Sequence, residues 1–141
     1  MKKKAETHPV ARRLMTIPGV GAIVALNFVA LIDDPSRFRK AENVGAFLGL
    51  TPRRHQSGEI DWSGRVSKCG DGVMRSLLFE SATTLITRAR KFSALKSWAV
   101  RLAGRRGFAK AAVATARKLA VLMLTLWKNE TEFAWTKEDL A

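Results

Sequence analysis

The sequence predicts an all-α fold, a compact helical bundle in a single domain, and three observations favour it. Apolar residues recur at helical spacing over residues 73–86 and again over 92–102. Residues 109–128 form an alanine-rich stretch in which leucine, methionine and tryptophan follow the same spacing. The length of 141 residues suits one domain, and a hydrophobic share of 47% is enough for a substantial core.

Two helices joined by a glycine turn are predicted near the N-terminus. Residues 9–16 form a short basic helix that stops at Ile17, because the residue before a proline is driven out of the helical region. A Gly-Val-Gly turn leads into an apolar helix over 22–32, which we expect at the buried centre of the bundle. Backbone amides at a helix N-terminus favour anions, so Gly19 and Gly21 are candidate nucleic-acid contacts in a helix-hairpin-helix-like element. A tight turn between two packed helices explains the same glycines equally well.

Paired aspartates separate this helix from the next one. Asp33 and Asp34 precede a proline and a serine, and adjacent carboxylates at such a position act as a helix stop and cap far more often than as metal ligands. A short amphipathic helix then closes at Gly49. The single cysteine, Cys69, excludes an internal disulfide and a multi-cysteine metal site, so no metal or other cofactor is expected in this chain.

Residues 53–75 have the composition of a long basic Gly/Ser loop presented to phosphate. Hydrophobic residues are scarce there, and basic residues alternate with serine and glycine. Ile60, Trp62 and Val66 alternate with polar residues, which permits a small β-hairpin inside the loop. The candidate phosphate-binding residues are Arg53, Arg54, His55, Arg65, Lys68 and Arg75.

A reactive serine is a second interpretation of this loop. A serine hydroxyl attacks only when another group takes its proton and nearby charges stabilise the developing anion. Ser57 follows His55 by two residues, precedes Gly58 and is surrounded by arginines, which suits attack on a DNA phosphodiester. From spacing alone, however, Ser57 is more often a turn residue or a hydrogen-bond donor to phosphate, and His55 more often a surface or DNA-contacting side chain.

The charge balance indicates the kind of partner. The formal net charge is +13 and the sequence pI is near 10.9, an excess that favours a polyanion, nucleic acid first. The N-terminal lysines are not followed by an apolar run, so no signal peptide is predicted. The longest apolar run, over 119–127, is far shorter than the roughly 20 residues that cross a bilayer. We therefore expect a soluble protein in the cytoplasm, associated with the nucleoid.

The C-terminal part shows a basic turn and an acidic end. Residues 105–107 form the basic turn before the last long helix, whose remaining charges are read as a solvated face. Residues 131–141 are acidic, and Phe133 and Trp135 are candidates to dock on the bundle. The predicted domain limits are a basic lead over 1–13, a helical domain over 14–135 and a frayed tail over 136–141.

Several sequence blocks in register resemble one known family. The blocks are MTIPGVG at 15–21, DPSRF at 34–38, GLTPR at 49–53, QSG at 56–58 and GRVSK at 64–68, followed by the helix that contains Arg75. Together they resemble the C-terminal transposase domain of the insertion sequence 110 (also 116 and 902) family. The similarity extends over nearly the whole chain, and several blocks in order are more specific than any single one.

The resemblance implies a DNA recombinase whose helical domain supplies a serine nucleophile that becomes covalently attached to DNA. That serine corresponds to Ser57, with Ser63 and Ser67 as fallback candidates. Family members also carry a ribonuclease-H-like domain, whose acidic residues bind magnesium, and a structured RNA guides them. We expect this chain to be a truncated member without the acidic domain, with DNA, structured RNA and a second copy of the chain as candidate partners and no membrane. The alternative is a non-catalytic nucleic-acid-binding module or remnant.

Overall fold

The computed structural model describes residues 2–50, 68–89 and 93–134, and the side chains within these ranges except those of Lys2 and residues 68–71. These ranges contain helices and no strand, which confirms the all-α prediction. The β-hairpin considered for Ile60, Trp62 and Val66 lies outside the described residues. The elements are α1 (Lys2–Thr7), α2 (Pro9–Leu14), α3 (Ala22–Ile32), η1 (Pro35–Arg37), α4 (Asn43–Phe47), α6 (Lys68–Thr87), α7 (Ala94–Arg106) and α8 (Phe108–Asn129).

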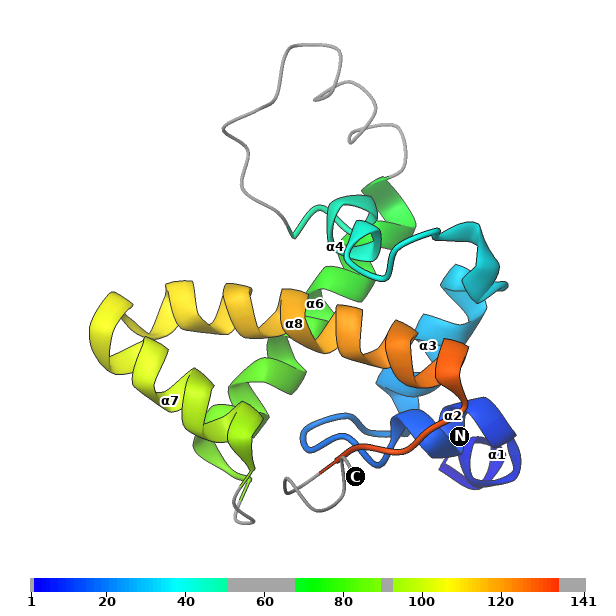
Figure 1. Ribbon diagram of the computed structural model, residues 1–141, viewed down its shortest axis with the longest axis horizontal. Coiled ribbons are helices and arrows are strands. Elements are labelled where there is room, and N and C mark those ends of the chain that lie inside the picture. The colour runs from blue at the N-terminus through cyan, green and yellow to red at the C-terminus, as the bar shows by residue number, and fades with distance from the viewer. Residues whose placement is uncertain (1, 51–67, 90–92, 135–141) are drawn as a thin grey trace, which may run out of the picture.

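The long helix α8 crosses the whole molecule, and most other elements pack against it (Figure 1). It contacts α6, α7, α4, α2 and η1, and its buried face includes Leu119, Met123 and Leu124. This face gives α8 the amphipathic pattern of a core-facing helix. None of the described helices, α8 included, is long and apolar enough to cross a lipid bilayer.

The expected central position of the apolar helix α3 is wrong. This helix lies at one side of the bundle, where it packs against α1, α2 and α6 (Figure 1). Phe28 and Ile32 are fully buried, whereas Ile23 is 53% exposed. A helix with apolar residues on nearly every side buries only the stripe that meets its neighbours, so composition alone overstated the burial of α3.

The N-terminal helix α1 was not predicted, since its three lysines read as a basic lead. Ala5 in this helix is fully buried, and α1 packs against α2 and α3. His8 caps the following helix: the backbone N–H of Ala11 donates a hydrogen bond to His8 Nδ1 at 3.2 Å. Pro9 occupies the first turn, where a missing N–H costs nothing. Helix α2 ends at Leu14, two residues before the predicted limit.

Polar side chains fasten the segment between α3 and α4. Asp34 caps η1 by accepting hydrogen bonds from the backbone N–H and the hydroxyl of Ser36, and these bonds lower the pKa of the Asp34 carboxyl. The structural role predicted for Asp34 is therefore confirmed. Arg37 Nη1 donates to the carbonyl of Ile32 at 3.0 Å, and Lys128 Nζ donates to the carbonyl of Phe38 at 2.8 Å. Arg37 and Lys128 thus serve the fold of this segment.

The second half of the chain departs from prediction mainly at helix ends. Helix α6 begins at Lys68, inside the stretch predicted as loop, because glycine costs a helix only about 1 kcal/mol and a long helix tolerates it. Ser93 caps α7 by accepting a hydrogen bond from the backbone N–H of Lys96 at 3.1 Å. Helix α7 continues into the predicted basic turn and ends at Arg106, and its C-cap, Gly107, has a φ of 94°. Gly107 makes the sharp turn into α8.

Candidate nucleic-acid interface

Most of the predicted site residues fall in the part of the chain that the structure does not describe. These are Arg53, Arg54, His55, Ser57, Ser63, Arg65 and Ser67. Lys68 is the first residue of α6, but its side chain is not among those described. The described residues nearest the site are those on either side of residues 51–67, among them Arg75. The turn that contains Gly19 and Gly21 is also described.

A fixed helix end precedes the central segment, residues 51–67. The N–H of Leu50 donates to the carbonyl of Gly45 at 2.8 Å, and the N–H of Gly49 donates to the carbonyl of Ala46 at 3.0 Å. With Gly49 at a φ of 74°, this is the Schellman arrangement that closes a helix on glycine. Leu50 is buried, as the hydrophobic residue of this motif usually is. The prediction that the short helix closes at Gly49 is confirmed.

Arg75 joins this helix end to α6. Its Nη1 donates to the carbonyl of Leu48 at 3.3 Å, and the side chain is half-buried. A Cβ placed on Gly49 would lie 2.7 Å from the same nitrogen, so a larger residue there would displace the guanidinium from this position. Arg75 therefore supports α4 from α6. A guanidinium carries five N–H donors, so this bond leaves donors that can meet a phosphate.

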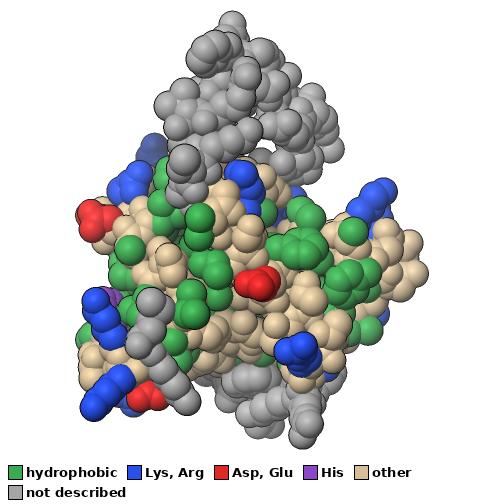
Figure 2. Space-filling model, turned by 180° about the vertical axis from the view of Figure 1, so that it is seen from behind, with side chains coloured by type: hydrophobic (Ala, Val, Ile, Leu, Met, Phe, Trp, Pro, Cys, Tyr) green, Lys and Arg blue, Asp and Glu red, His purple; other side chains and the backbone are tan. Residues whose placement is uncertain are grey.

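An open pocket lies beside this junction. It has a volume of about 570 Å³ and is lined by Gly49, Leu50, Arg75, Ser76, Phe79, Glu80 and Val113. The pocket therefore combines one guanidinium with one carboxylate and exposed apolar surface. Phe79 and Val113 are each about 40% exposed, among the large hydrophobic side chains that remain on the surface. Figure 2 shows such side chains scattered over one face of the molecule.

The glycine turn between α2 and α3 is held against α6. Gly19 has a φ of 90°, and a Cβ placed on it would lie 2.6 Å from the backbone oxygen of Ser81. Close packing therefore accounts for Gly19 without any ligand. Gly21 is the N-cap of α3 and is exposed, and a Cβ added to it would have no atom of the described residues within 4 Å. Of the two glycines, Gly21 is the one that leaves room for a partner to approach the backbone.

Helix α6 brings these two features together. Arg75 near its start contacts the helix end at Gly49, and Ser81 contacts the turn at Gly19. At a rise of 1.5 Å per residue, the two points lie about 9 Å apart along α6. The glycine turn and the edge of the basic segment thus share one supporting helix. No group of three or more His, Cys, Asp or Glu that could hold a metal occurs within residues 2–50, 68–89 and 93–134.

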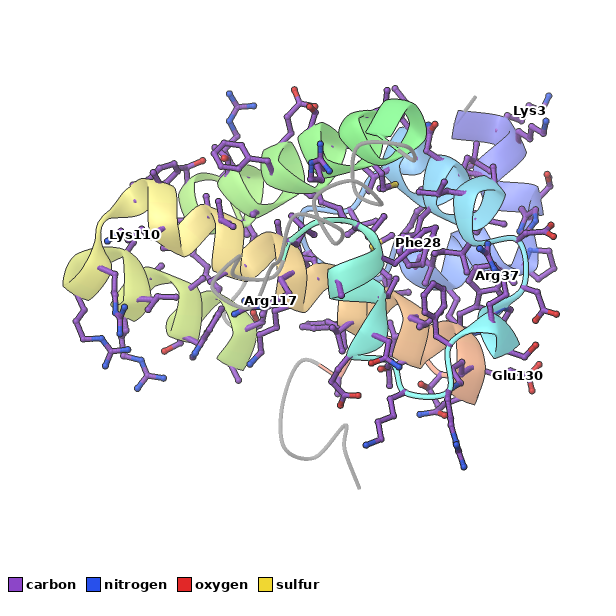
Figure 3. All side chains as sticks on the ribbon, turned by 90° about the horizontal axis from the view of Figure 1, so that it is seen from above. Lys3, Phe28, Arg37, Lys110, Arg117 and Glu130 are labelled. Carbon is purple, nitrogen blue, oxygen red and sulfur yellow. The ribbon has the colours of Figure 1, made fainter. Side chains whose placement is uncertain are left out.

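The hairpin of α7 and α8 is a basic surface, and the sequence interpretation set aside the charges on α8 as a solvated face. Arg101, Arg105, Arg106 and Lys110 are all exposed near its tip. Figure 3 shows Lys110 at the far end of the hairpin, away from Phe28 in the core. A readable signal was present, since residues 81–129 contain no aspartate or glutamate. An acid-free stretch of this length with many cations indicates an anionic partner.

Comparison with known proteins gives a consistent result. Residues 11–97 match the model of a family described as "Transposase IS116/IS110/IS902 family". The chain is 35% identical over 133 residues to the transposase for insertion sequence element IS1111A of Coxiella burnetii (strain RSA 493 / Nine Mile phase I), which covers 93% of this chain and 36% of that protein. It is 36% identical over 121 residues to a probable family 20 transposase of Pseudomonas aeruginosa, which covers 85% of this chain and 36% of that protein.

A relative with a different name is also similar. The pilin gene-inverting protein of Moraxella lacunata is 37% identical over 73 residues, which is 51% of this chain and 23% of that protein. No solved structure matches the chain. The chain spans about a third of the length of these two transposases.

Proposed function

Because the chain belongs to the transposase IS116/IS110/IS902 family, we propose that it is the helical part of a DNA transposase and that Ser57 is its nucleophile. The observation that carries the proposal is the family match over residues 11–97, which includes the whole basic segment around Ser57. The net charge of +13 supports DNA as the partner, because phosphate contacts dominate the affinity of proteins for nucleic acid.

The proposed reaction is a phosphoryl transfer to serine. Ser57 Oγ bonds to a backbone phosphorus while the bond from that phosphorus to one deoxyribose oxygen breaks. The hydroxyl proton passes to a base, for which His55 is the candidate nearest in sequence, and the leaving oxygen gains a proton from solvent. The products are a phosphoserine diester and a DNA strand with a free hydroxyl. Arginines stabilise the charge on the non-bridging oxygens in the transition state.

Described residues that flank the segment around Ser57 support this proposal. Gly49 and Leu50 fix the end of α4 that precedes the central segment, and Arg75 ties that end to α6. We assign Arg53, Arg54, His55, Arg65, Lys68 and Arg75 to phosphate binding, and Gly21 to backbone approach at the N-terminus of α3. Gly19 keeps the turn against α6 and so supports Gly21.

The chain spans about a third of the length of these transposase relatives. We therefore infer that complete strand exchange needs the remainder of such a protein, in the same polypeptide or in another. A magnesium-binding acidic set would come from that remainder. Structured guide RNA and a second copy of the chain remain proposed partners. A purely nucleic-acid-binding module is the second candidate, and the strongly basic composition favours it without requiring any chemistry.

A covalent adduct decides between the two candidates. The full chain is incubated with labelled DNA that carries an insertion-sequence end, with and without the acidic domain of a relative, and resolved by denaturing electrophoresis. We expect an adduct with the wild type that disappears in Ser57→Ala, while affinity stays within about twofold. Ser63→Ala and Ser67→Ala are matched controls that should keep the adduct. An adduct that survives in Ser57→Ala, or none under any condition, would overturn the assignment of Ser57.

A further inference from the structure

An apolar groove between α7, α8 and residues 133–134 is bordered by cations. Its volume is about 500 Å³, and its lining includes Leu95, Trp98, Val121 and Leu122. The side chains of Arg101 and Lys118 line the same groove. Lys118 Nζ lies 4.4 Å from the centroid of the Trp98 ring, which places the ammonium in cation–π contact with the indole. The groove therefore combines an aromatic ring with two positive charges.

The cations continue from the groove toward the tip of the hairpin. Counted from Trp98, Arg101 is three residues and Arg105 seven residues further along α7. All three therefore share one face of the helix. On α8, Lys110 and Lys118 are two turns apart and lie on neighbouring parts of its surface. In Figure 3, Lys110 marks the tip of the hairpin and Arg117 lies further along the same helix. A charged path thus leads from the groove outward.

Within residues 2–50, 68–89 and 93–134, no ion pair neutralises the cations of this path. Residues 81–129 contain no acidic residue, and within the described parts of the chain Arg105 and Lys110 form no ion pair. The acidic residue that follows the stretch, Glu130, lies at the opposite end of α8 (Figure 3). Charges separated by more than a Debye length of about 8–10 Å are largely screened from one another. The positive field of the hairpin is therefore open to an external anion.

We infer that this face binds a single-stranded stretch of nucleic acid, with a base seated in the groove against Trp98 and the adjoining phosphates on Arg101, Arg105 and Lys118. An unpaired base can leave its strand and stack on an aromatic ring, whereas the bases of a duplex are stacked inside it. This explains why an apolar groove and a row of cations occur side by side. The inference rests on the proposed function only in taking nucleic acid as the partner.

The test measures affinity for single-stranded DNA, single-stranded RNA and duplex DNA of one sequence across a salt series, using the full chain. Trp98→Leu keeps the groove apolar but removes the stacking surface, so single-strand affinity should fall by about fivefold to a hundredfold. Arg101→Ala with Arg105→Ala should lower the log-log salt slope for single strands by about 1.4, at about 0.7 per lost phosphate contact. Duplex affinity should change little in Trp98→Leu.

Matched controls keep the result interpretable. Arg39→Ala with Lys40→Ala removes the same charge from an exposed turn on another part of the molecule and should leave the single-strand slope nearly unchanged. Lys118→Met tests the groove again at an exposed position, in case Trp98→Leu disturbs folding. Three results would overturn the inference. One is an equal loss of affinity for duplex and single strand in Trp98→Leu, and another is unchanged affinity in both groove variants. The third is an equal change of the salt slope in the control. Ser57→Ala affects the adduct alone, so the two proposals fail separately.

Discussion

Gly19→Ala should destabilise the fold strongly, through two effects that the structure makes explicit. At a φ of 90°, a residue with a Cβ is strained by about 1–2 kcal/mol. The added Cβ would also lie 2.6 Å from the backbone oxygen of Ser81, and a backbone atom cannot swing aside as a side chain can. Moving the turn away from α6 adds an overpacking cost of about 1–3 kcal/mol. The free energy of unfolding should fall by about 2–5 kcal/mol in total.

Urea unfolding and thermal unfolding, both followed by circular dichroism, measure this loss. At about 3 °C per kcal/mol for a chain of this size, Tm should drop by about 6–15 °C. Gly21→Ala is the matched control: its Cβ would meet no described atom within 4 Å, its φ is −99°, and a weaker N-cap preference opposes it. We expect less than about 1 kcal/mol there. Equal Tm values for the two variants would refute the reasoning, because the close approach of Gly19 to Ser81 would then carry no energetic weight.

Two further substitutions test contacts inside the bundle. Arg75→Met leaves the carbonyl of Leu48 without this donor and should lower the free energy of unfolding by about 1–3 kcal/mol in urea titration, with Arg75→Lys intermediate. Unchanged stability with weakened DNA binding would instead make Arg75 purely a phosphate ligand. Thr115→Val should stabilise by about 1 kcal/mol, because the buried Thr115 hydroxyl has no hydrogen-bond partner among the described residues. Thr125→Val is its control, since Thr125 Oγ1 donates to the carbonyl of Val121 at 2.8 Å, and a similar gain there would contradict this explanation.

Local sequence signals predicted the helices well where the cause was local. Gly49 marked the end of α4 because only glycine easily adopts the positive φ of a helix-closing residue. The alanine-rich stretch with helically spaced leucines predicted α8 within a residue at each end. Helix α1 was missed because its lysines suggested a solvated lead, while the burial of Ala5 against α2 and α3 depends on tertiary contacts that no local pattern contains.

The site was less predictable, because the sequence does not show which acceptor the guanidinium of an arginine will bind. Arg75 was predicted as a phosphate ligand from its place beside the basic segment, yet its guanidinium binds a carbonyl on another helix. The close approach of Gly19 to Ser81 likewise joins parts of the chain that are far apart in sequence. The groove at Trp98 required the pairing of α7 with α8, although the acid-free stretch that surrounds it was readable beforehand.

The buried side chains of α8 grow in size along the helix, and this grades its local stability. Its first half buries Ala111, Ala112 and Ala116, whereas its second half buries leucines and methionine. Since each buried methylene contributes about 0.8 kcal/mol, far less apolar area anchors the first half per turn. The free energy of local opening therefore rises toward the end that Lys128 fastens to Phe38. We therefore expect amide hydrogen exchange to be faster at the hairpin end of α8 than at the end near Lys128.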